Sequence, residues 1–135
     1  MSDAFADTNI VLYLLDDGPK AATAETVISR RPLVSVQVLN ETLVNLRRKA
    51  GMDWDEAATF LAAIRTLCPV VPLTAETHDL GRALAARHRL SVYDAMIVAS
   101  ALLAGCSTLY SEDMHPGLVI EGSLTLVNPF AADPA

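Results

Sequence analysis

Cysteine is scarce in this sequence. The only two cysteines are Cys68 and Cys106, and neither lies in a CxxC or mixed Cys/His pattern. A disulfide framework needs several cysteine pairs, and a structural zinc site needs cysteines and histidines at close, regular spacing. The sequence therefore argues against both, and we expect the two thiols to be small core residues.

Basic residues are also few. The chain has 10 Lys and Arg against 16 Asp and Glu, a formal net charge of −6, which is the wrong sign for a protein whose whole surface attracts nucleic acid or anionic membrane. This sum treats every carboxylate as free, and carboxylates that hold divalent cations would raise the effective charge. Two basic clusters, residues 47–49 and 87–89, could then line a phosphate track, although such clusters are more often solvated helix ends.

Long hydrophobic runs are missing as well. The longest, residues 92–104, contains Asp94 and Ser100, and as a helix it would span roughly 20 Å, short of the ~30 Å hydrocarbon core of a membrane. The N-terminal stretch carries Asp3 and Asp7 where a signal peptide needs a basic region and then an apolar one. We therefore expect no membrane span and a cytoplasmic protein.

The sequence does contain enough apolar residues for one core. With 135 residues and 52% hydrophobic composition, the chain suits a single domain, residues 1–135. Five short apolar segments are predicted strands: residues 4–6, 32–36, 70–73, 108–111 and 124–127. Helical patterns or caps lie between them, at residues 10–15, 19–29, 37–50, 53–67, 74–88 and 91–104. This alternation favours a three-layer α/β/α fold with a central parallel sheet of about five strands.

Acidic residues gather at one predicted edge of that sheet. Asp7 directly follows the first strand, and Glu112 and Asp113 follow the fourth. Glu41 lies just over a turn into the helix that leaves the second strand. Asp94 lies in the first turn of a helix that must run antiparallel to the fourth strand, because only a short connection joins them. In open α/β sheets, ligands bind at the carboxyl ends of the strands.

Each carboxylate also has a purely structural interpretation. Asp7 could cap a helix, Asp94 could form a capping box with Ser91, Glu41 could be a surface residue, and Glu112 and Asp113 could be turn residues. However, Glu41 has no cation at helical spacing, and the helix that carries Asp94 is apolar all round, which favours burial. Several converging carboxylates repel one another, so a hard divalent cation, Mg²⁺ or Mn²⁺, is the natural partner and would support hydrolysis.

These residues resemble the PIN-domain nucleases, specifically the VapC-type toxins of bacterial toxin–antitoxin pairs. The resemblance rests on short motifs in order along the whole chain: ADTN at residues 6–9, NE at 40–41, YDAMIVASAL at 93–102, YSEDM at 110–114, then Gly117 and the closing VNPF. The resemblance implies a parallel five-stranded sheet and endoribonuclease activity. It also implies a homodimer and a cognate antitoxin that lies along the active-site groove.

The resemblance also assigns residues. It implies that four carboxylates form the catalytic and metal-binding quartet around Mg²⁺ or Mn²⁺: Asp7, Glu41, Asp94 and Asp113. Thr8 and Ser111 would be supporting polar groups, and Asn9 would orient the first carboxylate, while Glu112 stays outside the quartet. The RNA backbone would be held by some of six basic residues, among which the sequence does not choose: Arg47, Arg48, Lys49, Arg82, Arg87 and Arg89.

Other functions fit the sequence less well. Haloacid-dehalogenase-like phosphatases need a second aspartate where this chain has Asn9, and a receiver-type domain needs a lysine after a late strand, which is missing after Tyr110. No histidine lies near a nucleophile motif, which argues against Ser-His-Asp hydrolysis. A PIN fold that binds RNA or protein without cutting remains the non-enzymatic alternative, although a pure binder has no need of four mutually repelling carboxylates.

Overall fold

The computed structural model describes residues 3–131, so the two ends of the predicted single domain, residues 1–2 and 132–135, lie outside the described residues. The strands in this range are β1 (Ala4–Ala6), β2 (Val34–Ser35), β3 (Val70–Val71), β4 (Thr108–Tyr110), β5 (Val119–Ile120) and β6 (Leu124–Val127). The helices are α1 (Thr8–Leu12), α2 (Lys20–Ser29), α3 (Val36–Arg48), α4 (Trp54–Leu67), α5 (Ala75–His88) and α6 (Val92–Leu103), with a 3₁₀ turn, η1 (Tyr13–Leu15), after α1.

The predicted parallel strands are all present. β1, β4 and β6 pair in parallel, and β2 pairs in parallel with β3. A parallel bridge between Phe5 and Leu33 joins the two groups, with hydrogen bonds of 2.9 Å from Ala6 N–H to Leu33 C=O and from Leu33 N–H to Ala4 C=O. The α/β class with a mainly parallel central sheet is therefore confirmed.

One strand, β5, was not predicted. It pairs antiparallel with β6, with Ile120 opposite Leu124, and forms the outer edge of the four-stranded sheet β1-β4-β6-β5. The turn between the two strands places Glu121 at φ 51° and Gly122 at φ 70°, and such left-handed backbone is typical of tight hairpins. The available signal was an apolar stretch followed by Glu121-Gly122 and a second apolar stretch, which is typical of a hairpin and differs from the parallel alternation of the other strands.

The core is centred on the three adjacent parallel strands. Phe5, Leu109 and Leu126 lie opposite one another in the register of β1, β4 and β6, and all three are almost fully buried. The middle of α6 is buried from Ala95 to Ala101, as its apolar sequence predicts, although its first residues, Val92 and Tyr93, are exposed. α6 is thus a buried helix whose N-terminal end reaches the surface.

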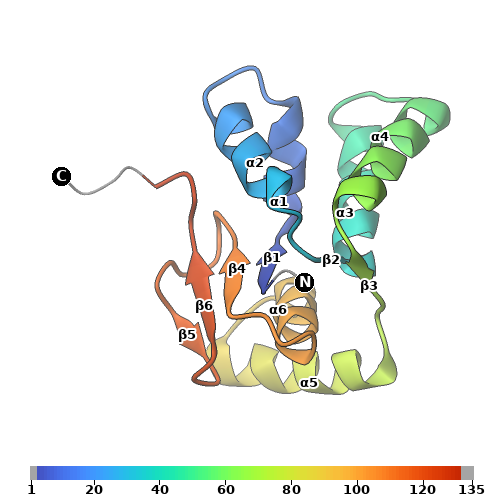
Figure 1. The fold of residues 1–135 in the computed structure, drawn as a ribbon. Helices are drawn as coiled ribbons and strands as arrows, with labels where there is room; N and C mark the ends of the chain where they lie inside the picture. Colours follow the sequence, from blue (N-terminus) through green and yellow to red (C-terminus); the bar gives the residue numbers. More distant parts are fainter. Residues whose placement is uncertain (1–2, 132–135) are drawn as a thin grey trace.

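Helix caps place the site-bearing helices. Ser35 caps α3 through its hydroxyl, which accepts a hydrogen bond from Val38 N–H at 3.3 Å, so β2 passes into α3 with no loop between them. Asp53 and Glu56 form the predicted capping box of α4, and Thr74 caps α5. In Figure 1, α1 with α2 and α3 with α4 lie above the sheet, while α5 crosses below it.

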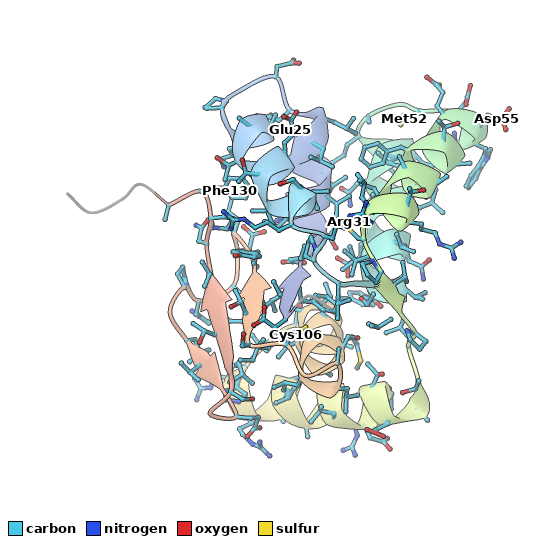
Figure 2. All side chains as sticks on the ribbon, viewed as in Figure 1. Glu25, Arg31, Met52, Asp55, Cys106 and Phe130 are labelled. Carbon is cyan, nitrogen blue, oxygen red and sulfur yellow. The ribbon has the colours of Figure 1, made fainter. Side chains whose placement is uncertain are left out.

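The remaining predictions concern membranes and cysteine. Among the residues that the structure describes, no helix is long and apolar enough to cross a membrane. Cys68 and Cys106 are both buried free thiols, as predicted, and burial raises the pKa of each to about 11. Cys106 lies in the interior where α6 leads into β4 (Figure 2). Both cysteines are core residues.

Candidate acidic site

Asp7 is the most deeply buried of the candidate carboxylates, with 5% of its surface exposed. It follows β1 directly and caps α1: its Oδ1 accepts a hydrogen bond of 2.6 Å from Thr8 N–H. Its Oδ2 accepts a second one of 2.8 Å from the Ser111 hydroxyl, which comes from the end of β4. The capping interpretation of Asp7 is therefore correct, and the side chain is also tied across the sheet.

Burial raises the pKa of Asp7 to about 6. The loss of solvent is the largest cause, and the charges of Asp94 and Glu41 raise the pKa further, while the hydrogen bonds from Ser111 and Thr8 lower it. Among the described residues, none of the groups that shift this pKa is a cation. Asp7 is thus a buried carboxylate whose electrostatic neighbours are also acidic.

Glu41 lies on α3, half-buried, and faces the start of α1. Its Oε1 accepts a hydrogen bond of 3.3 Å from the Thr8 hydroxyl, and its Oε2 accepts one of 2.7 Å from Gln37 Nε2, one helical turn earlier. Both partners are neutral donors, so they orient the carboxylate without compensating its charge. Thr8 therefore serves both Asp7, through its N–H, and Glu41, through its hydroxyl.

Asp94 lies in the first turn of α6 and is half-buried. Ser91 caps this helix, and its hydroxyl accepts a hydrogen bond of 3.2 Å from Asp94 N–H. The pKa of Asp94 is raised, chiefly by burial and in part by the charge of Asp113, while a hydrogen bond with Ser91 lowers it. Asp94 therefore combines the structural role of a capped first turn with electrostatic coupling to a second candidate carboxylate.

Asp113 lies on the exposed segment after β4, and Asn9 Nδ2 donates a hydrogen bond to its Oδ2. Asn9 was expected to orient Asp7, and in this structure its side-chain amide bonds to Asp113. The hydrogen bonds to the Asp7 side chain come from Ser111 and the Thr8 N–H.

Glu112 does not join the other carboxylates. Lys20 Nζ lies 2.5 Å from its Oε2, the Tyr13 hydroxyl donates to its Oε1, and Lys20 Nζ lies 3.2 Å from Tyr13 Oη. We call Tyr13, Lys20 and Glu112 the anchor cluster. The hydrogen bonds from Lys20 and Tyr13 lower the pKa of Glu112, in contrast to Asp7 and Asp94. Tyr13 and Lys20 were not predicted from the sequence, in which the available signal was that Lys20 is the first basic residue of the chain.

The structure brings the four predicted carboxylates into electrostatic contact but not around a single point. Asp94 and Glu41 act on the pKa of Asp7, and Asp113 acts on that of Asp94. Within residues 3–131, however, no three Asp, Glu, His or Cys side chains lie in an arrangement that could hold one metal ion. The donor chemistry still fits a hard divalent cation, because carboxylate oxygens are its preferred ligands and the charged groups that act on Asp7 are both acidic.

A cavity opens beside Glu41. It has a volume of about 510 Å³ and lies between α3 and the start of α6; its lining includes Asn40, Glu41, Asn45, Arg48 and Tyr93. Arg48 therefore shares a cavity with a candidate carboxylate. Two of the other basic residues have partners elsewhere: the Arg47 guanidinium lies 4.3 Å from the ring centre of Trp54, and Arg87 pairs with Glu121.

Together, the parallel sheet and the acidic side chains at its carboxyl edge define a small α/β domain of the PIN type. The PIN domain family model matches residues 4–115. The chain therefore belongs to the PIN-domain family, and the resemblance noted in the sequence is confirmed.

Solved structures of similar fold come from toxin–antitoxin systems. The VapC20 toxin of Mycobacterium tuberculosis, described as cleaving the sarcin–ricin loop, is 28% identical with a TM-score of 0.68, and the match covers 82% of this chain and 89% of that one. A toxin–antitoxin complex from Klebsiella pneumoniae matches at 20% identity and a TM-score of 0.74, over 96% and 99% of the two chains. FitAcB from Neisseria gonorrhoeae matches at 17% identity and 0.68, over 96% and 99%. Comparison with curated proteins gives no match.

Proposed function

We propose that this protein is a metal-dependent endoribonuclease and the toxin component of a toxin–antitoxin pair. The observation that carries the proposal is the buried carboxylate of Asp7, whose pKa is raised to about 6 with only acidic groups adding to the effect of burial. Keeping such a group is unfavourable unless a cation compensates it. Membership of the PIN family and the likeness to the sarcin–ricin loop cleaving toxin support RNA as the substrate.

Asp7, Glu41, Asp94 and Asp113 would hold Mg²⁺ or Mn²⁺. When bound, such an ion supplies Lewis-acid activation of water and neutralises charge on the phosphate. Water would attack the phosphorus of an RNA phosphodiester in line with the 3′ oxygen, the P–O3′ bond would break, and the products would be a 5′-phosphate and a 3′-hydroxyl.

The neighbouring polar residues orient the carboxylates for this task. Ser111 and the Thr8 N–H hold the two oxygens of Asp7, while the Thr8 hydroxyl and Gln37 hold those of Glu41. Asn9 holds Asp113. These hydrogen bonds fix the rotamers of the carboxylate side chains. Because the partners are neutral, the negative charge of the carboxylates stays available for the cation.

Arg48 is the basic residue that we propose to hold the RNA backbone. It lines the cavity beside Glu41, and a guanidinium there would pair with a phosphate next to the acidic site. Arg47 is a weaker candidate because it lies over Trp54 and donates a hydrogen bond to Met52 C=O.

We further propose a cytoplasmic homodimer that a cognate antitoxin inhibits. The similar structure from Klebsiella pneumoniae is a toxin–antitoxin complex, which supports such a partner here. A basic antitoxin side chain placed among the carboxylates would compensate their charge in place of the cation, which explains inhibition without a conformational change.

The test uses the full chain purified free of any antitoxin. We expect it to cleave RNA in Mg²⁺ or Mn²⁺ and to stop when a chelator is added, and we expect Asp7→Asn and Asp94→Asn to abolish cleavage. Arg48→Ala should raise KM more than it lowers kcat, with Arg87→Ala as the matched control.

Two outcomes would count against this function. Full cleavage by both aspartate variants would overturn the assignment of the site. If the wild type does not cleave RNA, yet binds it with equal affinity in Mg²⁺ and in chelator, the alternative of a non-catalytic PIN-fold binding module is correct.

A further inference from the structure

The segment that carries Asp113 has no regular secondary structure of its own. Residues 111–118 connect β4 to β5 without a helix or strand. Three consecutive side chains at its start are bonded to residues from the beginning of the chain: Ser111 to Asp7, Glu112 to Lys20 and Tyr13, and Asp113 to Asn9. Backbone hydrogen bonds to β6 hold both ends of this segment, from Ser111 N–H to Val127 C=O and from Gly117 N–H to Leu126 C=O. Between these ends, the contacts of Glu112 and Asp113 with the beginning of the chain are made by side chains.

The anchor cluster is the most extensive of these three contacts. The Tyr13 ring packs edge to face on Phe130, with ring centres 4.8 Å apart, and Lys20 Nζ lies 4.7 Å from the centre of the Tyr13 ring and 5.6 Å from that of Phe130. Phe130, in the segment after β6, lies beside α2 in Figure 2. The two aromatic rings thus fix the lysine that pairs with Glu112, one residue before Asp113.

We propose that Tyr13, Lys20 and Glu112 are positioning residues that hold Asp113 in reach of Asp94 and so set the affinity of the acidic site for divalent cations. The inference rests on the proposed function in that it requires the site to bind a cation. None of the three residues has to touch the cation or the RNA. Their effect passes through the backbone from Glu112 to the adjacent Asp113.

The burial of the cluster fits a local role better than a role in global stability. The Lys20 side chain is 42% exposed and the Glu112 side chain 19%, and ion pairs at such positions contribute little to the stability of the whole fold. Removing the pair should therefore leave the protein folded, with the segment still bonded to β6 at Ser111 and Gly117, while Glu112 and the adjacent Asp113 lose their fixed position. Residues that orient metal ligands typically change metal affinity by about 10-fold or more when they are removed.

Lys20→Met separates this role from two simpler ones. If Glu112 were itself a ligand, or if only the net charge near the site mattered, losing Lys20 would free a carboxylate and strengthen cation binding. If the cluster positions Asp113, the same substitution weakens cation binding. The two interpretations therefore predict opposite signs for one variant.

The experiment measures Mn²⁺ binding by the full chain without RNA, by calorimetric titration and by the spin-resonance signal of free Mn²⁺. We expect the dissociation constant for Mn²⁺ to rise about 10-fold in Lys20→Met and in Tyr13→Phe. Tyr13→Phe leaves every charge in place. In Lys20→Arg, which keeps the positive charge, the dissociation constant should equal the wild-type value. Glu121→Gln is the matched control, since it breaks the exposed ion pair with Arg87 at the hairpin before β6. Urea unfolding in chelator checks that each variant is folded.

Unchanged or tighter Mn²⁺ binding in both Lys20→Met and Tyr13→Phe would overturn the inference. The proposed function is tested separately by RNA cleavage with the wild type, so this result would leave it intact. A wild type that binds no Mn²⁺ would overturn both. Should Lys20→Met fail to fold, Tyr13→Phe carries the test, because it removes one hydroxyl and keeps the ring against Phe130.

Discussion

Asp7 shows how one residue can be structurally satisfied and electrostatically unfavourable at once. Each of its oxygens accepts a hydrogen bond, and it caps α1. Even so, burial raises its pKa to about 6, which means that the folded protein holds the proton of Asp7 more tightly than the unfolded chain does. A purely structural cap would be served as well by asparagine, which is an equally good N-cap. The charge is therefore the property that the structure alone does not explain.

This imbalance predicts that Asp7→Asn stabilises the cation-free protein at neutral pH. The folded pKa lies above the unfolded value of 3.8, so the folded state binds more protons and wild-type stability falls as pH rises from about 4 to about 6. The full effect is at most about 3 kcal/mol. Asparagine keeps the cap and avoids this loss of stability. The stability of the variant should therefore exceed that of the wild type by an amount that grows as pH rises from about 4 to about 6.

Urea unfolding in chelator at pH 4 and pH 7.5 measures this difference. Asp79→Asn, at an exposed position on α5, controls for the loss of one negative charge from the whole molecule. A variant that is no more stable than the wild type at pH 7.5 would show that Asp7 is compensated in the fold without a cation.

The polar residues around the site were only partly predictable. Ser111 and Thr8 hydrogen-bond to candidate carboxylates, and each lies within two residues of the end of a strand. Asn9 supports Asp113 rather than Asp7, and Lys20 pairs with Glu112 across 92 positions of sequence. Both contacts depend on how the segment after β4 folds back over α1 and η1. Helical periodicity and motif spacing describe local order, and they give no information about contacts between the segment after β4 and the distant α1 and η1.

At the scale of elements, α5 and α6 pack most closely where α5 has a glycine. A Cβ built at Gly81 would lie 2.7 Å from Met96 Sδ and 3.4 Å from Ala95 C=O. Ala95 and Met96 directly follow Asp94 on α6, so the approach of these two helices helps to set the position of that carboxylate. Gly81 is therefore needed for the space it leaves, since its backbone lies in an ordinary helix.

We predict that Gly81→Val destabilises the protein by about 1–3 kcal/mol, because a branched side chain must displace both Met96 and the α6 backbone. In a Met96→Ala background the penalty should fall, and a double-mutant cycle should give a coupling energy of at least about 0.5 kcal/mol. Ala86→Val, at an exposed position on the same helix, measures what a branched side chain costs there without tight packing. Valine forms helix better than glycine, so helix propensity does not contribute to the loss at position 81. Equal losses at positions 81 and 86 would mean that the α5–α6 spacing is not limited by Gly81.

Element types and caps were the most predictable part of the fold. Asp53 with Glu56, Thr74 and Ser91 begin helices where the sequence places them, because a cap is a contact within four residues. The parallel strands follow from short apolar segments between helices. β5 was missed because it is antiparallel and lies outside the alternation of parallel strands and helices, and its existence depends on β6 being available as a partner. The shorter a strand is, the more its identity depends on tertiary pairing.

At the scale of the whole molecule, the net charge of −6 and the acidic edge act together. An RNA substrate is repelled by the average field of such a protein, and the repulsion is greatest where unpaired carboxylates gather. Cations bound at that edge would reverse the local sign and give phosphate a place to bind, with Arg48 beside it. Cation binding would thus be needed both for chemistry and for substrate approach.

Cation binding to the folded state alone should therefore raise its stability. The gain follows RT ln(1 + [L]/Kd), about 2.7 kcal/mol at 100 times Kd, which corresponds to a rise in Tm of several degrees for a domain of 135 residues. We predict a saturable rise in Tm with MgCl₂ beyond that of KCl at equal ionic strength. Asp94→Asn should remove this rise, and Glu121→Gln should keep it. An equal rise in both variants would mean that Mg²⁺ stabilises the protein at a place that does not include Asp94, and that the acidic edge is not its binding site.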